Sequence, residues 1–338
     1  MKILIVFKDP STDSPNACHQ GLGITALNLA MSLCEMRLDA TALPVANGEY
    51  LWQKLAGAWS DYTHVILSAP FIDAAYLGKL FAQFPAKRFA LVYHSNLGFL
   101  TQDRFAGVSI PQYIALEKQC RNFTVAANSA ELSDAIQQAT GLPFTHLPNL
   151  YHLPAKVQRT RASWTNGMTL NIGLFGAARM LKNWLTAGAA AMIMSRGLNA
   201  SVRLHVSSGR DEGSSATRSV LDALLTLNPK VQLVAVPWLN HDDFRRYLYG
   251  MDLLLQPSFT ETFNNVTADG CSCGVPSVVS EAIDWVPANW IAKADSAVQV
   301  AAVGCALLRD RKAVDKGWKA LDQYNRKACQ QWSNWLGA

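Results

Sequence analysis

Short apolar runs alternate along the chain with longer segments whose apolar residues recur at helical spacing. In the first half these runs are four expected strands, at residues 2–7, 64–68, 89–94 and 123–129. After the fourth run, residues 130–139 have the pattern of a helix, which Ser129 can cap at its start and Gly141 can end. The first half therefore predicts a repeating order of strand and helix.

The second half repeats this alternation after a polar segment at residues 151–167. Its apolar runs are five expected strands, at residues 169–175, 201–207, 231–237, 253–255 and 277–280. Asn240 can cap a helix over residues 241–249, and Asp242 and Asp243 lie in its first turn, where acidic side chains complement the helix dipole. Both halves thus predict an α/β architecture built from strands that are followed by helices.

The length and composition fit two such domains. The chain has 338 residues, of which 50% are apolar and 16% are charged, as expected for an α/β protein with much buried surface. We predict two Rossmann-like, doubly wound domains, at residues 1–150 and 168–318, with a linker at 151–167 and a last helix at 319–338. No internal repeat other than this alternation is visible.

One stretch, residues 252–281, combines this pattern with two carboxylates. Glu261 lies in a polar loop after an apolar run, and Asp269 lies eight positions later, about one turn into a short predicted helix. The first N–H groups of a helix have no partner within it, so they can bind an anion. The residues at this helix start are Asn264, Asn265 and Val266.

This stretch resembles the E-x7-E region of retaining GT-B glycosyltransferases, those of family 4 (glycosyl transferases group 1). Asp269 stands where that family usually has its second glutamate, and a shorter carboxylate must sit closer to a diol that it binds. The positions that match the family pattern in register are Pro257, Ser258, Glu261, Phe263, Asn265, Gly274, Pro276, Val278, Val279 and Ser280.

A second match lies in residues 176–183, which align with the G-R-x-x-x-x-K-G loop of the same family. Lys182 falls on the lysine that neutralises the donor diphosphate, whereas Ala177 stands where the family has an arginine. Arg179 lies two residues further on and can reach into the same cleft. Cations in this loop make physical sense because negative charge builds on a departing diphosphate. An ordinary surface lysine is the alternative for Lys182.

The first half carries weaker signals. His94 falls at the carboxyl end of a predicted strand, where ligands meet open α/β sheets and where the family often has a histidine near the donor sugar. A histidine with a purely structural role is an equal alternative. Pro148 and Asn149 are the two residues that match the family segment found at the end of the first domain. Residues 331–335 resemble the aromatic end of these enzymes, whose last helix crosses back onto the first domain.

Gly21 and Gly23 open the first predicted helix. Residues 21–26 fit the dinucleotide fingerprint G-x-G-x-x-A, but thirteen residues separate the first strand from these glycines, and no acid ends the next strand near residues 43–45. We therefore reject a dinucleotide site, because the fingerprint needs its glycines directly after the strand. A glycine pair that opens a helix after a long first loop is instead what the family shows, and we assign both glycines to the donor side. A glycine-tolerant turn with close helix packing is an equal alternative for Gly21.

The long first loop, residues 8–20, is the expected acceptor side. It contains Asp13 and His19, which can orient a hydroxyl, and it has no excess of Lys or Arg. Residues 1–150 carry ten Lys and Arg against eleven Asp and Glu, whereas residues 151–338 carry twenty against fourteen. A basic second half suits a nucleotide diphosphate, and the first half does not favour a nucleic acid partner.

The resemblance implies transfer of a sugar from a nucleotide-diphospho-sugar to a hydroxyl acceptor with retention of configuration, across a cleft between two domains. It assigns Glu261 to the donor-sugar hydroxyls, Lys182 and the helix-start amides to the diphosphate, and Asp269 to the ribose. His94 would reach the sugar from the first domain. No metal or other cofactor is implied, since there is no D-x-D pair.

Several alternatives stay open. They are a nucleotide-sugar-binding protein without transferase activity, another GT-B enzyme such as a phosphorylase or an epimerase, and a glycosyltransferase that acts on modified nucleic acid. Seven scattered cysteines without a C-x-x-C pair favour a reducing, cytoplasmic location. No apolar run reaches the length of a membrane span, and the opening run is too short for a signal peptide, which leaves a peripheral membrane contact open.

Overall fold

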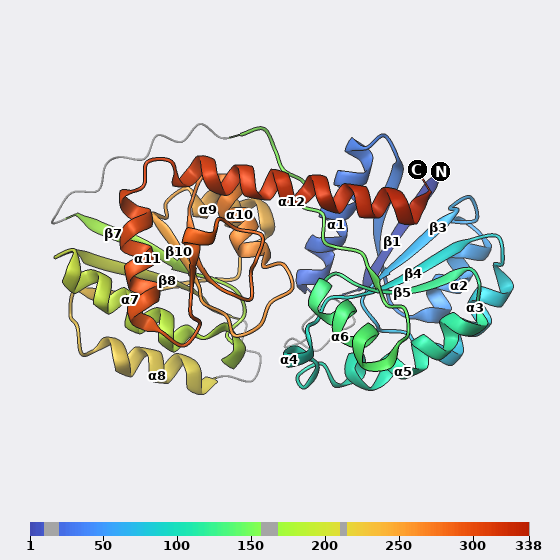
Figure 1. The fold of residues 1–338 in the computed structure, drawn as a ribbon, viewed down its shortest axis with the longest axis horizontal. Helices are drawn as coiled ribbons and strands as arrows, with labels where there is room; N and C mark the ends of the chain where they lie inside the picture. The colour runs from blue at the N-terminus through green and yellow to red at the C-terminus, as the bar shows by residue number, and fades with distance from the viewer. Residues whose placement is uncertain (10–19, 157–167, 210–214, 338) are drawn as a thin grey trace. The chain divides into compact units, whose positions relative to one another are not determined.

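The computed structural model describes residues 1–9, 20–156, 168–209 and 215–337 of the chain (Figure 1). The chain forms two compact units. The first unit comprises Met1–His152 together with Asn325–Ala338, and the second comprises Leu153–Tyr324. Each unit contains its own six-stranded parallel sheet.

The sheet of the first unit has the strand order β2-β1-β3-β4-β5-β6, and all its neighbours are parallel. Its strands are β1 (Lys2–Lys8), β2 (Asp39–Val45), β3 (His64–Ser68), β4 (Arg88–Tyr93), β5 (Phe123–Ala127) and β6 (Thr145–His146). The four predicted strands of this half are confirmed to within two residues at their ends. A further strand expected near residues 43–45 corresponds to β2, whereas β6 was not predicted. Its two residues are too few to produce an apolar run.

The helices of the first unit begin where short polar side chains can cap them. Asn47, Asp73, Asp103 and Ser129 each accept a hydrogen bond from the backbone N–H three residues later. The helices are α1 (Gln20–Glu35), α2 (Gly48–Ala56), α3 (Ala74–Gln83), α4 (Leu97–Leu100), α5 (Arg104–Gln119) and α6 (Ala130–Thr140). As predicted, α6 stops at Gly141, which has the left-handed conformation (φ 68°) that glycine adopts without strain.

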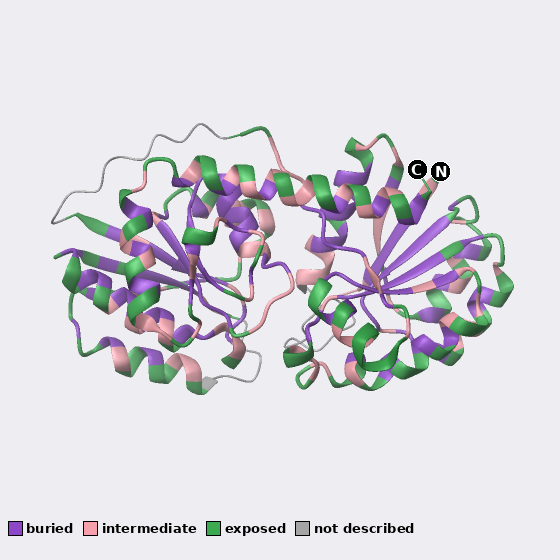
Figure 2. Cartoon of the chain, in the orientation of Figure 1, coloured by how far each residue is buried: buried purple, intermediate pink, exposed green. Residues whose placement is uncertain are grey.

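The sheet of the second unit has the order β12-β11-β10-β7-β8-β9 and is also parallel. Its strands are β7 (Thr169–Leu174), β8 (Ser201–Ser207), β9 (Val231–Val236), β10 (Leu253–Gln256), β11 (Ser277–Ser280) and β12 (Ile291–Ala292). The five predicted strands are therefore present. In both units the central strands are buried, because helices cover the sheet (Figure 2).

The helical segments of the second unit follow the strands in the same alternating order. They are η2 (Met180–Lys182), α7 (Trp184–Gly197), α8 (Ser215–Leu225), α9 (His241–Leu248), α10 (Asn265–Cys273), η3 (Ala288–Trp290), α11 (Ala297–Arg309) and α12 (Ala313–Leu336). Asn240 caps α9 as predicted: its side chain accepts a hydrogen bond from the backbone N–H of Asp243.

Helix α12 is shared by the two units, and its residues from Asn325 on belong to the first unit. The indole Nε1 of Trp332 donates to the backbone oxygen of Pro148 (2.8 Å), and that of Trp335 donates to Thr124 Oγ1 (3.3 Å). The side chain of Asn325 exchanges two hydrogen bonds with the backbone of Tyr151. The aromatic residues near the end of the chain are thus structural parts of the first unit. None of the described helices combines the length and the apolar character that crossing a membrane requires.

Each sheet has one place where the strand order reverses direction. In the first unit it lies between β1 and β3, since β2 is added on one side and β4 to β6 on the other. In the second unit it lies between β7 and β10, since β8 and β9 are added on one side and β11 and β12 on the other. Ligands of open α/β sheets bind outside the carboxyl ends of the strands at such a point. The topology therefore marks one candidate site in each unit.

Candidate functional site

The carboxylate of Glu261 lies at the switch point of the second unit, in the loop between β10 and α10. Its Oε1 atom accepts hydrogen bonds from Ser258 Oγ (2.9 Å) and Asn264 Nδ2 (3.0 Å), and it forms an ion pair with Lys182 Nζ. The side chains of Lys182 and Glu261 are 17% and 13% exposed. Three donors therefore fix one oxygen of a largely buried carboxylate.

Asn264 both caps α10 and holds Glu261. Its Oδ1 accepts from the backbone N–H of Thr267 (2.8 Å), while its Nδ2 donates to Glu261 and to Gln256 Oε1 (3.1 Å). The residue is buried and has a left-handed backbone (φ 65°), which asparagine tolerates better than most residues. The start of α10, predicted to bind an anion, is thus coupled to the carboxylate through one side chain. Asn265 and Val266 are the first two residues of α10, as predicted.

Lys182 is brought to Glu261 because two loops are tied together. Lys182 ends η2 in the loop after β7, and the next residue, Asn183, is buried with a left-handed backbone (φ 56°). Asn183 Nδ2 donates to the backbone oxygens of Pro257 (2.9 Å) and Ala294 (2.5 Å). These bonds join the segments after β7, β10 and β12. Asn183 was not predicted as a site residue, although it lies within the matched loop.

Ala177 and Arg179, which lie in the loop after β7 together with Lys182, differ in their exposure. Ala177, which stands where the family pattern used in the sequence comparison has an arginine, is buried, with 5% of its surface exposed. Arg179 is partly exposed and lies three residues before Lys182. Gly176 has a φ of 111°, and a Cβ atom added to it would lie 3.6 Å from Cε of Lys182. The lysine side chain therefore passes close to this glycine.

Asp269, predicted to bind ribose, is buried within α10 and is paired with a histidine. The His241 Nε2 atom lies 2.8 Å from Asp269 Oδ1. This hydrogen bond is the main reason why the pKa of His241 is raised above its usual value, with partial burial acting in the opposite direction. His241 was not among the site residues predicted from the sequence. Its one signal is its place, directly after a helix cap at the end of a strand.

His94 lies at the switch-point edge of the first unit, directly after β4. Its Nε2 is 3.1 Å from Ser68 Oγ, and its Nδ1 is 3.1 Å from Asn128 Nδ2, which also donates to Asn149 Oδ1 (3.2 Å). Since the amide nitrogen of Asn128 can only donate, Nδ1 is the acceptor and Nε2 carries the proton. Burial lowers the pKa of His94 to about 4. The imidazole is therefore neutral at pH 7.

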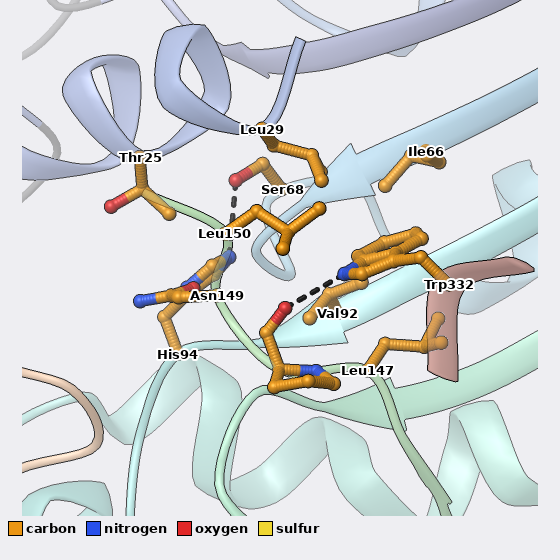
Figure 3. A pocket seen from close by; sticks show the side chains of 11 residues that line it. Thr25, Leu29, Ile66, Ser68, Val92, His94, Leu147, Asn149, Leu150 and Trp332 are labelled. Atoms are coloured by element: carbon orange, nitrogen blue, oxygen red, sulfur yellow. Dashed lines mark hydrogen bonds between the residues drawn. The ribbon is translucent and has the colours of Figure 1, made fainter. Parts of the chain in front are cut away.

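A small cavity of about 10 Å³ adjoins His94, enough for about one water molecule (Figure 3). Ser68, His94 and Asn149 line its polar part. Its other walls come from α1, β3, β4, the segment after β6 and α12, through Thr25, Leu29, Ile66, Val92, Leu147, Pro148, Leu150 and Trp332. Pro148 and Asn149, the two residues kept from the family segment, thus lie beside the predicted histidine.

The two glycines of α1 have different surroundings. A Cβ atom on Gly23 would lie 3.1 Å from the ring of Phe7, whereas one on Gly21 would have no atom within 4 Å. Helix packing therefore accounts for Gly23 and not for Gly21. Asp13 and His19, predicted to meet the acceptor, lie outside the described residues. Within the described part of the chain, no group of three His, Cys, Asp or Glu residues could hold a metal ion.

Comparison with known proteins gives structural matches and no match in sequence. No protein-family profile matches the chain, and no curated protein matches it in the sequence comparison. The structure of HepE from Anabaena in complex with UDP and glucose has a TM-score of 0.62 and 15% identity, and the match covers 100% of both chains. Sucrose-phosphate synthase from Thermosynechococcus elongatus has a TM-score of 0.65 and 14% identity, with 99% of this chain and 98% of that chain covered.

A third neighbour is longer. A mutant of TarM from S. aureus, solved in complex with fondaparinux, alpha-GlcNAc-glycerol and UDP, has a TM-score of 0.60 and 12% identity. The match covers 81% of this chain and 55% of TarM, so the chain spans about half the length of that protein. The neighbours share one architecture of two α/β domains, and the two six-stranded parallel sheets described above have the same architecture. This chain has the GT-B fold.

Proposed function

We propose that this protein is a retaining glycosyltransferase that moves a sugar from a nucleotide-diphospho-sugar to a hydroxyl acceptor. The observation that carries the proposal is the pairing of Lys182 with Glu261 at the switch point of the second sheet. A cation and a carboxylate at the carboxyl ends of two adjacent strands are what a diphosphate and a sugar require.

The two side chains have separate roles in this proposal. Lys182 and the N–H groups at the start of α10 bind the diphosphate and neutralise the charge that it gains as the glycosidic bond breaks. Glu261 accepts hydrogen bonds from the hydroxyls of the donor sugar and so holds its reactive carbon in place. Since Lys182 occupies one oxygen of Glu261, an entering diphosphate competes with the carboxylate for the lysine.

His94 and the leaving phosphate complete the mechanism. The Nε2–H of the neutral imidazole faces Ser68 Oγ, and in this proposal it exchanges that hydroxyl for a sugar oxygen of the bound donor without adding a positive charge. The acceptor hydroxyl attacks from the face that the diphosphate leaves, and a phosphate oxygen takes its proton. No carboxylate is assigned as a covalent nucleophile. The configuration of the sugar is therefore retained.

Uridine diphosphate is the first donor nucleotide to test, because structures of TarM and HepE have been solved with UDP. On the acceptor side we keep Asp13 and His19 as the residues that orient the hydroxyl. The acidic residues of the first loop, residues 8–20, favour an uncharged or weakly charged acceptor over nucleic acid.

Donor hydrolysis without acceptor is the direct test, since water can replace the acceptor. The protein is incubated with UDP-, ADP- and GDP-linked hexoses, and nucleoside diphosphate release is measured. Proton NMR of the first sugar formed then gives its anomeric configuration. We expect release from one donor class and a product with the configuration of the donor. A product of inverted configuration would refute the retaining mechanism, and the absence of both binding and release would refute the whole proposal.

A second candidate is a protein that binds nucleotide sugars without transferring the sugar. Two positions depart from the family pattern in this chain, since Ala177 replaces an arginine and Asp269 replaces a glutamate. Ala177 is also buried, and Asp269 is paired with His241. Tight donor binding without release or transfer, across a screen of sugar, lipid and small alcohol acceptors, would favour this candidate over the enzyme.

A further inference from the structure

At the position of the second carboxylate, the group that solvent can reach is an imidazole. The side chain of Asp269 is 4% exposed, whereas that of its partner His241 is 27% exposed. A bound ligand can therefore reach the imidazole of His241 more readily than the carboxylate of Asp269.

The fold places His241 at the ligand-binding edge of the sheet. It is the first residue of α9, which follows β9, and Asp269 belongs to α10, which follows β10. Helices that follow parallel strands begin at the carboxyl edge of the sheet, and ligands of such sheets bind there. The cap at Asn240 fixes the first turn of α9, and the 2.8 Å hydrogen bond to Asp269 fixes the ring.

The hydrogen bond also determines what His241 can offer to a ligand. A carboxylate can only accept, so Nε2 carries a proton and Nδ1 is left for other partners. Among the described residues, none forms a hydrogen bond with Nδ1. A neutral His241 thus presents one acceptor, and a protonated His241 presents one donor. Either form can bind a hydroxyl group, which is both donor and acceptor.

We propose that His241 contacts the ribose hydroxyls of the donor nucleotide and that Asp269 is a positioning residue that acts through it. This inference rests on the proposed function, because it assigns the ribose part of the same donor site. It changes the assignment made from the sequence: the ribose contact moves from the carboxylate of α10 to the imidazole of α9.

The test compares each nucleotide with and without its ribose hydroxyls. UDP, ADP and GDP are titrated calorimetrically into the wild-type protein, and the tightest is compared with its 2′,3′-dideoxy analogue. The same pair is then titrated into His241→Ala. We expect this variant to lose about tenfold in affinity for the ribonucleotide, which is about 1.4 kcal/mol, and nothing for the dideoxy analogue. His241→Gln, which keeps a polar side chain, is the second variant if His241→Ala does not fold.

Arg246→Ala is the matched control, because Arg246 lies on the same helix and its side chain is 74% exposed in an ion pair with Asp243. It should leave both affinities unchanged. An equal loss for both nucleotides in the His241 variants, or no loss for either, would overturn the inference while wild-type binding leaves the proposed function standing. If the wild-type protein binds none of the three nucleotides, the proposed function fails first.

The role of Asp269 has its own readout, the pKa of His241 measured by NMR. Asp269 and Asp242 raise this pKa, whereas Arg245 and partial burial lower it. Asp269→Asn removes the largest contribution, so the pKa should fall and the ribonucleotide affinity should fall with it. A variant that keeps the wild-type pKa and affinity would show that Asp269 does not position His241.

Discussion

The carboxyl edges of the two sheets have the same topology and different chemistry. In the first unit the side chains at this edge are neutral hydrogen-bonding groups, those of Ser68, His94, Asn128 and Asn149. In the second unit they form two pairs of ionisable groups, Lys182 with Glu261 and His241 with Asp269. A doubly wound sheet thus determines where a ligand is placed, and the side chains at the strand ends determine which ligand it is.

His94 and His241 show the same difference between the two edges. His94 has an amide and a hydroxyl as partners, so burial dominates and lowers its pKa to about 4. His241 has a carboxylate as partner, which stabilises the protonated ring and raises its pKa. The first edge therefore keeps its histidine neutral, whereas the side chains at the second edge form pairs of ionisable groups. This difference supports our proposal that the diphosphate binds at the second edge.

Glu261 offers the largest test of this contrast. We expect Glu261→Ala to lower turnover at least about a hundredfold, near 3 kcal/mol, with little change in Tm, because the carboxylate positions the donor sugar. Glu261→Gln keeps an acceptor for Ser258 and Asn264 and should show a similar loss. Asp295→Ala, an exposed acid of the same unit, is the control. A variant with lower Tm and an unchanged rate per folded molecule would make Glu261 structural.

Lys182 tests whether the second edge holds the diphosphate. Lys182→Ala should weaken nucleoside diphosphate binding by about 2 kcal/mol, roughly thirtyfold, because a charge-assisted hydrogen bond is lost. Arg179→Ala should have a smaller effect, and Lys293→Ala, at an exposed position of the same unit, should have none. Calorimetric titration measures all three. Unchanged affinity in the Lys182 variant would remove the loop after β7 from the donor site.

The pH dependence of the free energy of unfolding tests whether His94, at the first edge, is neutral. A histidine whose pKa is about 4 when folded and 6.5 when unfolded takes up its proton first in the unfolded state. Stability is therefore lost as the pH falls below 6.5, by up to about 2 kcal/mol between pH 7 and pH 5. His64, whose pKa is also lowered to about 4, adds a loss of the same sign.

Replacing His94 isolates its share of this loss. His94→Asn should be less stable than the wild type at pH 7, and its free energy of unfolding should decrease less on acidification. Denaturant titrations at a series of pH values measure both quantities. An identical pH dependence in the two proteins would mean that His94 is not held neutral in the folded state.

The glycines of α1 give the smallest expected effects. Gly21→Ala should stabilise the first unit by up to about 1 kcal/mol, since there is room for the methyl group and alanine favours a helix. Gly23→Ala should be destabilising relative to Gly21→Ala, because its Cβ atom would press on Phe7. Thermal unfolding of both variants decides this. A loss of donor binding in Gly21→Ala at unchanged Tm would instead assign Gly21 to the site.

The sequence by itself determined the elements of the chain and one half of the site. Apolar runs and polar caps identified the longer strands and helices, and the spacing of Pro257, Glu261 and Gly274 identified the loop after β10. These features are local, because a strand, a cap or a turn depends on residues that lie within a few positions of one another. The neutral state of His94 required more, since its partners Ser68 and Asn128 come from two other strand ends.

The tertiary structure decided which side chains meet. His241 and Asp269 are 28 residues apart, and they form a pair only because α9 and α10 are packed together. Asn183 likewise joins the segments after three strands, which no pattern within one segment can indicate. Contacts of this kind depend on strand order, and strand order results from packing two layers of helices on a twisted sheet. The pairing of the side chains at the second edge was therefore visible only once the sheet was assembled.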